Sequence, residues 1–371
     1  MGMIGGGPGA FIGPVHRLAA EMDREIELVA GVFSSRPDRA AAAAEQYAID
    51  HDRAYPNMET MFAAEKARAD GIDFVSIVTP NDHHAIAAFA ALSHGYPVIC
   101  DKPMTATLGQ AEALHALVVE RQLPFALTYT YSGYGLVREA RRLIAEGALG
   151  TVRKVVVEYP QGWLSQEEEE PIWRLDPDRA GQGGCIADIG IHAFHLAEFV
   201  SSLRVESLFA DLGRVVPGRL LDDDVSVLLR FCGGARGVLL ASQIEVGERN
   251  GLRFRIYGDR AGLSWCQEQP NTLTLQQAND ETRLIRAGDA GLSQPVQALQ
   301  RTPGGHPEGY LEAFANLYRE FAAGLDGTPT PLLPDAAEGL RSMQFIDAAI
   351  RSSDETRYVT MPDVNEGSAR Q

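Results

Sequence analysis

The chain of 371 residues is long enough for two domains with separate hydrophobic cores. Its hydrophobic share of 45% and charged share of 22% are ordinary for a globular protein and exclude a disordered or fibrous one. The formal net charge of -17, from 33 Lys+Arg against 50 Asp+Glu, argues against a protein that binds the phosphates of nucleic acids.

Charges, Gly or Pro interrupt every longer apolar run, so no stretch is expected to cross a membrane. The first residues lack the basic and apolar regions of a secretory signal, and the first strand is so short that the natural start is expected a few residues upstream of Met1. The four cysteines are scattered and form no CxxC pair, which argues against a disulfide framework or a structural zinc site. A cytoplasmic protein is therefore expected.

Strand-like and helix-like segments alternate over the first ~130 residues, which is the pattern of a parallel α/β sheet. A dinucleotide-binding domain of the Rossmann type is therefore predicted for residues 1–130. The expected strands are short and apolar, and the expected helices lie between them. The strands cover residues 3–4, 26–33, 74–78 and 97–100, and the helices cover residues 37–47 and 84–94.

The pattern changes after a predicted helix at 136–146, because strand-like segments then follow one another closely. This spacing predicts an α+β domain over residues 131–371 with an open, mainly antiparallel sheet. Its last helix is a candidate to pack back on the first domain. The strands are expected at 152–159, 205–211, 225–231, 237–243 and 252–257, and the helices at 190–200, 309–323 and 335–352.

A glycine-rich turn follows the first strand and precedes a helix. Gly5, Gly7 and Ala10 fit the pattern G-x-G-x-x-G/A, in which glycines let a pyrophosphate approach bare N–H groups at a helix start. The alternative is a merely flexible turn, but its place at the first strand-to-helix junction favours a dinucleotide. Phe11 and Ile12, which continue the turn, are further cofactor candidates.

The second strand ends in Ser34, Ser35 and Arg36, without the carboxylate that usually binds the adenosine ribose of NAD. An Arg at this place suits the 2′-phosphate of NADP, so these residues favour NADP or tolerance of both cofactors. The equally weighted alternative makes Ser34 a helix N-cap and Arg36 a surface charge.

Polar residues also follow the third and fourth strands, at the sheet edge where ligands bind in such folds. The alternative for the third-strand residues is turn and N-cap chemistry, and a lone Lys at the fourth strand is more often simply exposed. Their combination favours cofactor contact. The candidates are Thr79, Pro80, Asn81, His84, Asp101 and Lys102.

Asp188 and His192 are four residues apart, which places them on one face of a predicted helix. A histidine titrates near neutrality and suits removal of a hydroxyl proton, while a carboxylate nearby can hold the substrate. In one alternative Asp188 caps the helix and His192 fills the core. In another, Asp188, His192 and His195 bind a metal, but no further ligands are evident and no metal is expected.

The order of these motifs resembles that of the glucose–fructose oxidoreductase/inositol dehydrogenase (Gfo/Idh/MocA) family. The similarity extends over nearly the whole chain, although no single motif is decisive. Asp101 stands where the family more often has Glu. The motifs are the glycine turn, Thr79-Pro80-Asn81, Asp101-Lys102-Pro103, Trp173-Arg174 and Asp188-x-x-x-His192.

The resemblance implies that Lys102, Asp188 and His192 form a catalytic group. His192 is then the general acid and base, Lys102 polarises the reacting oxygen, and Asp188 positions the substrate. It also adds Trp173 and Arg174 to the cofactor contacts.

Within the family the chain is similar to inositol dehydrogenases, particularly those for scyllo-inositol that accept L-glucose. The residues for this are the turn from Gly7 to Gly13 and the segment from Gly305 to Tyr310. Since that subgroup is mostly linked to NAD, NAD is expected above NADP. The substrate candidates are Gln161, Trp163, Arg179 and His306 together with Lys102, Asp188 and His192.

The expected protein is thus a dehydrogenase for a secondary alcohol of a cyclitol or sugar, without nucleic-acid or membrane partners. The open sheet predicts a homo-oligomer, either a dimer or a tetramer. Two alternatives of other classes are an NAD-dependent glycosidase of the same fold and a non-catalytic sensor of dinucleotide and sugar.

Overall fold

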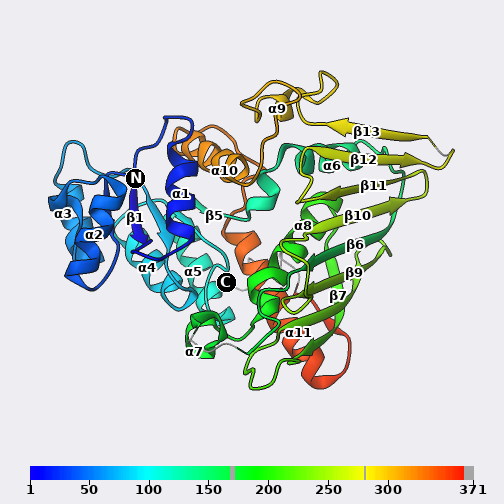
Figure 1. The fold of residues 1–371 in the computed structure, drawn as a ribbon, viewed down its shortest axis with the longest axis horizontal. Coiled ribbons are helices and arrows are strands. Elements are labelled where there is room, and N and C mark those ends of the chain that lie inside the picture. The colour runs from blue at the N-terminus through cyan, green and yellow to red at the C-terminus, as the bar shows by residue number, and fades with distance from the viewer. Residues whose placement is uncertain (168–171, 280, 363–371) are drawn as a thin grey trace. The chain divides into compact units, whose positions relative to one another are not determined.

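The computed structural model describes residues 1–167, 172–279 and 281–362, and the chain divides into two compact units (Figure 1). The first unit contains Met1–Tyr129 and Phe314–Leu340, and the second contains Thr130–Ala313 and Arg341–Gln371. The segment 314–340 therefore returns to the first unit. The sequence-based bounds placed it in the second domain, with the last helix as a candidate to pack back on the first. It is tied there by the Leu127 N–H, which donates to the Pro334 carbonyl oxygen at 2.9 Å.

A five-stranded parallel sheet forms the centre of the first unit, in the order β2-β1-β3-β4-β5. Its strands are short apolar runs, as expected for a sheet that is covered on both faces. The predicted parallel α/β domain is confirmed. The strands are β1 Gly2–Gly5, β2 Ala30–Val32, β3 Val75–Val78, β4 Val98–Cys100 and β5 Phe125–Leu127.

The helices of this unit connect the strands and complete its core. Asn57 and Thr107 cap two of them, each with a side-chain oxygen that accepts a backbone N–H three residues later. From the returning segment, Phe321 packs edge-on against Phe74 with ring centroids 5.1 Å apart. The helices are α1 Ile12–Glu21, α2 Pro37–Tyr47, η1 His51–Arg53, α3 Met58–Lys66, α4 Asn81–Ser93, α5 Leu108–Arg121 and α10 Tyr310–Leu325, of which residues from Phe314 onward belong here.

The second unit is built on a nine-stranded sheet in the order β13-β12-β11-β10-β6-β9-β8-β7-β14. All neighbouring pairs are antiparallel except β6 and β9, so the predicted mainly antiparallel sheet is confirmed. The strands are β6 Val152–Pro160, β7 Val205–Gly213, β8 Asp224–Phe231, β9 Arg236–Ser242, β10 Arg253–Gly258, β11 Ala261–Cys266, β12 Thr272–Gln277, β13 Thr282–Arg286 and β14 Val359–Thr360.

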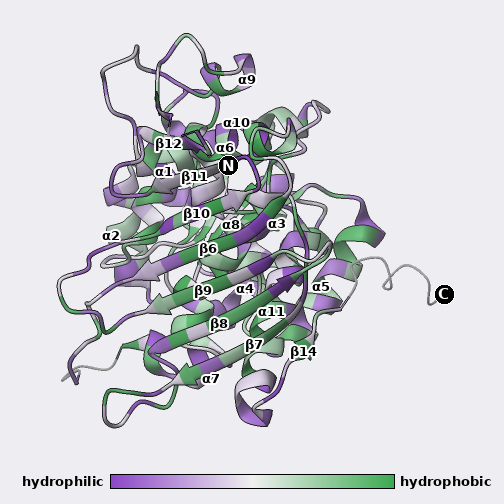
Figure 2. Ribbon diagram, turned by 90° about the vertical axis from the view of Figure 1, so that its right-hand side faces the viewer, coloured by the Kyte–Doolittle hydropathy of each residue, from purple (hydrophilic) through white to green (hydrophobic). Residues whose placement is uncertain are grey.

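Hydrophobic and hydrophilic residues alternate along the central strands of this sheet (Figure 2). One face is therefore buried against helices, among which Phe194 of α8 stacks on Phe345 of α11 at 4.1 Å between ring centroids. The helical elements are η2 Thr130–Gly133, α6 Gly135–Ala145, η3 Trp173–Leu175, α7 Pro177–Ala180, η4 Ile186–Gly190, α8 Ile191–Ser201, α9 Gln294–Gln297 and α11 Ala336–Glu355.

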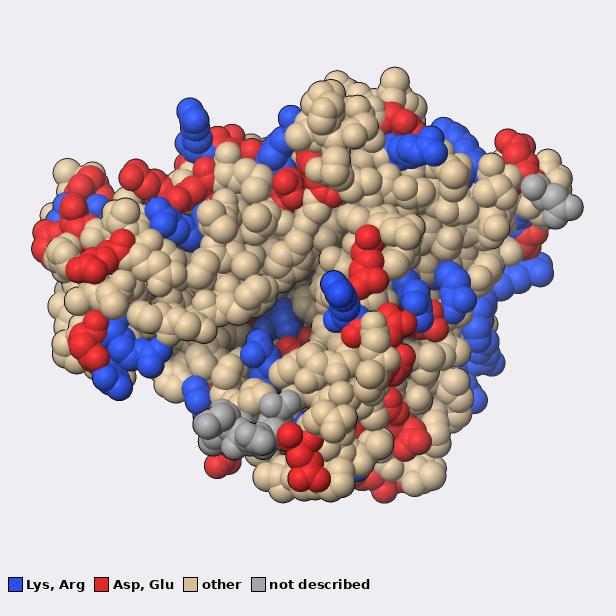
Figure 3. Space-filling view, in the orientation of Figure 1, with Lys and Arg blue, Asp and Glu red and all other residues tan. Residues whose placement is uncertain are grey.

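Charged side chains of both signs are interspersed over the face drawn in Figure 3. This mixture matches a chain whose charge is acidic overall but which also carries many Arg and Lys residues. Within the described parts of the chain, no helix combines the length and apolar character needed to cross a bilayer.

Candidate functional site

The glycine-rich turn lies at the carboxyl end of β1, which is paired with β2 on one side and β3 on the other. This is where the strand order reverses, and such points bind ligands in open parallel sheets. A Cβ atom at Gly5 would lie 2.8 Å from the backbone nitrogen of Thr79, and one at Gly7 would lie 2.5 Å from the carbonyl oxygen of Phe33. Only glycine fits these two positions, so the backbone of the turn is left bare for a ligand.

Tyr47 and Gly13 fix this turn in place. The Tyr47 hydroxyl donates to the Gly6 carbonyl oxygen at 2.6 Å. Gly13 of α1 lies so close to Gly6 that a Cβ on Gly13 would be 2.5 Å from its Cα. Phe11, by contrast, is 72% exposed at the start of α1. These features fit a dinucleotide whose pyrophosphate lies against the turn and the start of α1.

The end of β2 carries an ion pair that bears on cofactor choice. Arg36 donates through Nη2 to Oδ2 of Asp38 at 2.7 Å and through Nε to Oδ1 at 3.2 Å. This hydrogen bonding from Arg36 lowers the pKa of the Asp38 carboxyl. Ser34 accepts the backbone N–H of Arg36 at 3.2 Å, while Ser35 is exposed. Arg36 is therefore already engaged by a carboxylate that the sequence analysis overlooked.

His84 connects the turns that follow β3 and β4. Its Nδ1 lies 2.7 Å from the Pro103 carbonyl oxygen, and its Nε2 lies 2.8 Å from the Thr79 carbonyl oxygen. The side chain is buried at the first turns of α4, close behind Pro80 and Asn81. His84 can thus support the shape of the expected cofactor site by holding two turns together.

Asp101 and Lys102 lie in the turn that follows β4, and hydrogen bonds hold this turn in place. Oδ1 of Asp101 accepts the Lys102 N–H and the Thr128 hydroxyl, both at 2.9 Å. Nε2 of the buried His16 lies 4.0 Å from the same oxygen, and Nδ1 of His16 lies 2.7 Å from the hydroxyl of Tyr318. Burial lowers the pKa of His16 to about 4, so this histidine is neutral at physiological pH. The backbone of Lys102 is thereby anchored to the core of the first unit.

In the second unit, Asp188 lies in a π-helical turn rather than in the α-helix that the sequence predicted. The turn is η4, and α8 begins immediately after it at Ile191. Asp222 stabilises the start of the turn, because its two carboxylate oxygens accept the N–H groups of Gly184 and Ile186, each at 2.7 Å. Burial raises the pKa of Asp222. Single π-helical turns within helices are frequent at functional sites.

The carboxylate of Asp188 accepts a hydrogen bond and forms an ion pair. Nε2 of Gln243, which follows β9, donates to Oδ2 at 2.9 Å. Nε of Arg174 lies 3.6 Å from Oδ1, and the Arg174 guanidinium lies 4.5 Å from the centroid of the Trp173 ring. Arg174, which was expected near the cofactor together with Trp173, is thus a neighbour of Asp188, and Gln243 is a contact that sequence reasoning missed.

His192 lies on α8, one helical turn beyond Asp188, and is only 7% exposed. The ring of Tyr131 packs edge-on against the imidazole at 4.9 Å between centroids, and Tyr159 lies at 6.2 Å. Burial raises the pKa values of both phenols. His192 therefore lies in an aromatic cluster, one helical turn beyond Asp188, whereas Lys102 belongs to the first unit. The grouping of all three stays a prediction.

The expected substrate residues Gln161 and Trp163 continue this cluster toward the surface. Nε1 of Trp163 donates to Oε1 of Gln161 at 2.9 Å, and Nε2 of Gln161 donates to Oδ1 of Asn250 at 2.9 Å. Arg179 is exposed on α7, and His306 is exposed in a loop with its Nδ1 3.1 Å from the Pro303 carbonyl oxygen. A substrate role for these last two residues stays a prediction.

His195 is buried and stacks on Phe199 at 5.5 Å between ring centroids. In residues 1–167, 172–279 and 281–362, no group of three or more His, Cys, Asp or Glu side chains is placed to hold a metal ion.

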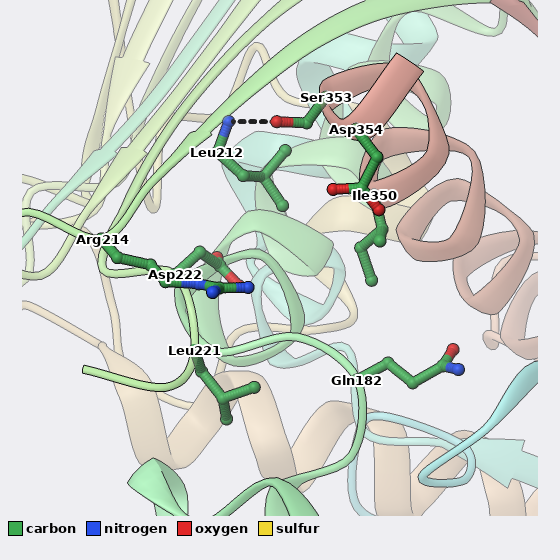
Figure 4. A pocket seen from close by; sticks show the side chains of 8 residues that line it. All are labelled: Gln182, Leu212, Arg214, Leu221, Asp222, Ile350, Ser353 and Asp354. Atoms are coloured by element: carbon green, nitrogen blue, oxygen red, sulfur yellow. Dashed lines mark hydrogen bonds between the residues drawn. The ribbon is translucent and has the colours of Figure 1, made fainter. Parts of the chain in front are cut away.

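A polar pocket of about 340 Å³ lies beside the π-helical turn (Figure 4). In Figure 4 the Arg214 side chain extends toward Asp222, the residue that anchors the turn. Ser353 on α11 accepts the N–H of Leu212 at 3.1 Å on another side of the pocket. The pocket contains none of the expected substrate residues. It is lined by Gln182, Leu212, Arg214, Leu221, Asp222, Ile350, Ser353 and Asp354.

Three of the proteins that resemble this chain are named as a dehydrogenase, a dehydrogenase homologue and an oxidoreductase. An inositol dehydrogenase homologue from Azotobacter vinelandii, solved with NAD+, has a TM-score of 0.91 and 33% identity over 97% of this chain and 96% of that one. An oxidoreductase from Sinorhizobium meliloti has a TM-score of 0.89 and 43% identity over 96% and 98%. Levoglucosan dehydrogenase from Pseudarthrobacter phenanthrenivorans is 24% identical over 98% of both chains.

Two family models match this chain. Residues 1–129 match the oxidoreductase family with an NAD-binding Rossmann fold, and residues 137–264 match the GFO/IDH/MocA C-terminal domain. Together these matches cover the glycine turn, Lys102, Asp188 and His192. The chain therefore belongs to the Gfo/Idh/MocA oxidoreductase family, and its first unit is an NAD-binding Rossmann domain.

Proposed function

We propose that this protein is a dehydrogenase that oxidises a secondary alcohol of a cyclitol or sugar, of the inositol, scyllo-inositol or L-glucose type. The observation that carries the proposal is the buried imidazole of His192 one helical turn beyond a carboxylate, Asp188, that is itself contacted by Gln243 and Arg174. Oxidation of an alcohol by hydride transfer requires a base that removes its hydroxyl proton as the hydride leaves its carbon. The inositol and levoglucosan dehydrogenases among its relatives support this substrate class.

In the proposed mechanism, His192 accepts the hydroxyl proton and Asp188 binds neighbouring hydroxyls of the substrate. The ammonium group of Lys102 stabilises the negative charge that develops on the reacting oxygen. Bound NAD supplies the hydride acceptor. Oxidation gives an inosose from a cyclitol, or a lactone if a pyranose reacts at its anomeric carbon.

The two tyrosines near His192 do not compete with it as a base. Tyr131 and Tyr159 both lie near the imidazole, and burial raises the pKa values of both phenols. Both phenols therefore remain protonated at neutral pH and cannot serve as bases there. An imidazole, by contrast, exchanges its proton in this range.

NAD is the proposed cofactor, with NADP as the alternative. The pairing of Arg36 with Asp38 supports this choice, because it occupies the guanidinium that would otherwise bind a 2′-phosphate. Ser35 stays exposed beside this pair and adds no charge of its own.

We also propose that the protein is a cytoplasmic homo-oligomer, either a dimer or a tetramer. The open face of the nine-stranded sheet carries Leu228, Leu240 and Tyr257, each more than a third exposed. Leu228 of β8 lies directly opposite Val238 of β9, so apolar side chains adjoin one another on this face. Light scattering coupled to gel filtration tests this, and a monomeric mass would contradict it.

Absorbance at the reduced-nicotinamide band tests the proposed activity. The protein is mixed with NAD or NADP and with scyllo-inositol, myo-inositol, levoglucosan and both enantiomers of glucose. Net formation of reduced cofactor with a cyclitol or sugar supports the proposal, and the fastest pair identifies substrate and cofactor. Cofactor binding without any net reduction would contradict it and would favour a redox-assisted glycosidase, or a sensor if glycosides are also left intact.

A further inference from the structure

Three residues beside His192 close a ring of hydrogen bonds. The Tyr159 hydroxyl donates to Oδ1 of Asn250 at 2.7 Å, and Nδ2 of Asn250 donates to the Tyr131 hydroxyl at 3.2 Å. The hydroxyls of Tyr131 and Tyr159 are also hydrogen-bonded to each other. Tyr131 and Tyr159 are buried, whereas Asn250 is half-buried in the loop between β9 and β10.

The donor and the acceptor of each hydrogen bond in this ring can be assigned from Trp163 and Gln161, which are hydrogen-bonded to it in series. An indole N–H can only donate, so the bond from Trp163 identifies its partner atom on Gln161 as the amide oxygen. The Gln161 atom that contacts Asn250 is then its NH₂ group, and it must meet the oxygen of Asn250. The orientation of the Asn250 amide, normally a matter of assignment, is thereby fixed by chemistry.

Each phenol has one proton, which determines the remaining bond. The Tyr159 hydroxyl uses its one hydrogen in the bond to Asn250. Tyr131 must therefore be the donor in the hydrogen bond between the two phenols. Every member of the ring therefore donates once and accepts at least once. Such a closed ring resists rotation of any one member, since one rotation breaks two hydrogen bonds.

We infer that Asn250 is a positioning residue for His192, acting through the ring that it closes with Tyr131 and Tyr159. This ring of hydrogen bonds keeps Tyr131 in its T-shaped contact with the imidazole and so limits where His192 can move. Trp163, which is 45% exposed, determines through Gln161 which atoms of the ring donate and which accept. This inference rests on the proposed function, because it assigns Asn250 a part in the same proton transfer.

Kinetics of Asn250→Ala and Tyr159→Phe test the inference. Each variant opens the ring, so each is expected to lower kcat about tenfold, the order expected when an acid–base group loses its alignment, while KM changes less than about twofold. The double variant is expected to be no slower than the slower single variant, because either change already opens the ring. Losses that multiply in the double variant, or a normal kcat in Asn250→Ala, would overturn the inference.

A second readout is independent of turnover. In protein labelled with ¹³C at histidine Cε1, the His192 signal is assigned by its loss in His192→Asn, and it should move in Asn250→Ala because the Tyr131 ring shifts. Asn57→Ala, which removes only a helix cap of the first unit, should leave the signal and kcat unchanged. An unmoved His192 signal in Asn250→Ala would contradict the inference. If no polyol is oxidised but the signal moves, the proposed function fails while the ring's contact with His192 stands.

Discussion

Gln243 holds Asp188 across 55 residues of sequence, through a hydrogen bond of 2.9 Å from its Nε2 to Oδ2 of the carboxylate. Gln243 is itself only 2% exposed, and its backbone N–H donates to the Asp223 carbonyl oxygen at 2.9 Å. The position of Asp188 is therefore set by the sheet as well as by its own helical turn. This relationship makes Gln243 a support for the substrate contacts that we propose for Asp188.

Changing Gln243 tests this support. Gln243→Leu removes the donor and is expected to lower kcat/KM about tenfold, since a misplaced carboxylate orients substrate hydroxyls poorly. Gln243→Glu places two carboxyl groups together, so its activity should recover as the pH falls and one of them gains a proton. Steady-state kinetics from pH 5 to pH 9 measure both effects. Gln276→Leu, on the exposed end of β12, is the control, and equal losses in both Leu variants would contradict the assignment.

The buried carboxylate of Asp222 should matter for stability. Asp222→Ala leaves the N–H groups of Gly184 and Ile186 without this acceptor inside the protein, which is expected to cost about 3 kcal/mol. Asp222→Asn keeps one acceptor oxygen and should cost less. Urea denaturation measures the free energy of unfolding for each variant. A cost in Asp222→Ala no larger than that of the exposed Asp211→Ala would show that the carboxylate does not stabilise the turn.

Cofactor preference should respond to the pair formed by Arg36 and Asp38. Asp38→Ala releases the guanidinium and is expected to raise kcat/KM for NADP about fivefold, the size of one exposed charge contact. Ser35→Asp should act in the opposite direction by repelling the 2′-phosphate. The ratio of kcat/KM for NAD and NADP is the measurement, with the exposed Glu45→Ala on the same helix as control. An unchanged ratio in both variants would mean that the end of β2 does not select the cofactor.

His16 should make stability depend on pH. Its pKa is lowered by burial to about 4, whereas the unfolded chain has the ordinary value of about 6.5. As the pH falls below 6.5, His16 binds a proton in the unfolded state but stays neutral in the folded state, so the free energy of unfolding decreases until about pH 4. Between pH 7 and pH 5 the loss from this one residue is about 2 kcal/mol. His16→Gln should lose correspondingly less over that range in urea denaturation, and parallel losses would contradict the prediction.

Both domain folds could be predicted from the sequence. The strands of the first unit are short apolar runs, and those of the second unit alternate apolar and polar residues. The prediction failed for β11, β12 and β13, whose alternation includes small and polar residues such as Gly262, Ser264 and Thr274. It also assigned the segment 314–340 to the other unit. An amphipathic helix shows which of its faces is buried, but not which unit covers that face.

The candidate site was predictable where spacing carries information. Asp188 and His192 are close in sequence, and the glycine turn has its own pattern, so both were identified. Gln243 and Asn250 were missed because their partners are brought close only by the register of the sheet and its loops. The π-helical turn was missed because it depends on Asp222, which lies 36 residues after Ile186 in the chain.

Transfer of deuterium from substrate to cofactor would show directly that the protein oxidises an alcohol by hydride transfer. Scyllo-inositol carrying deuterium at its ring carbons is incubated with the protein and NAD, and the reduced cofactor is analysed by mass spectrometry; the fastest cyclitol or sugar of the panel replaces it if another is preferred. We expect reduced NAD that carries one deuterium, and loss of this product in a His192→Ala variant that still binds NAD. Reduced NAD without deuterium, or undiminished transfer in His192→Ala, would contradict it.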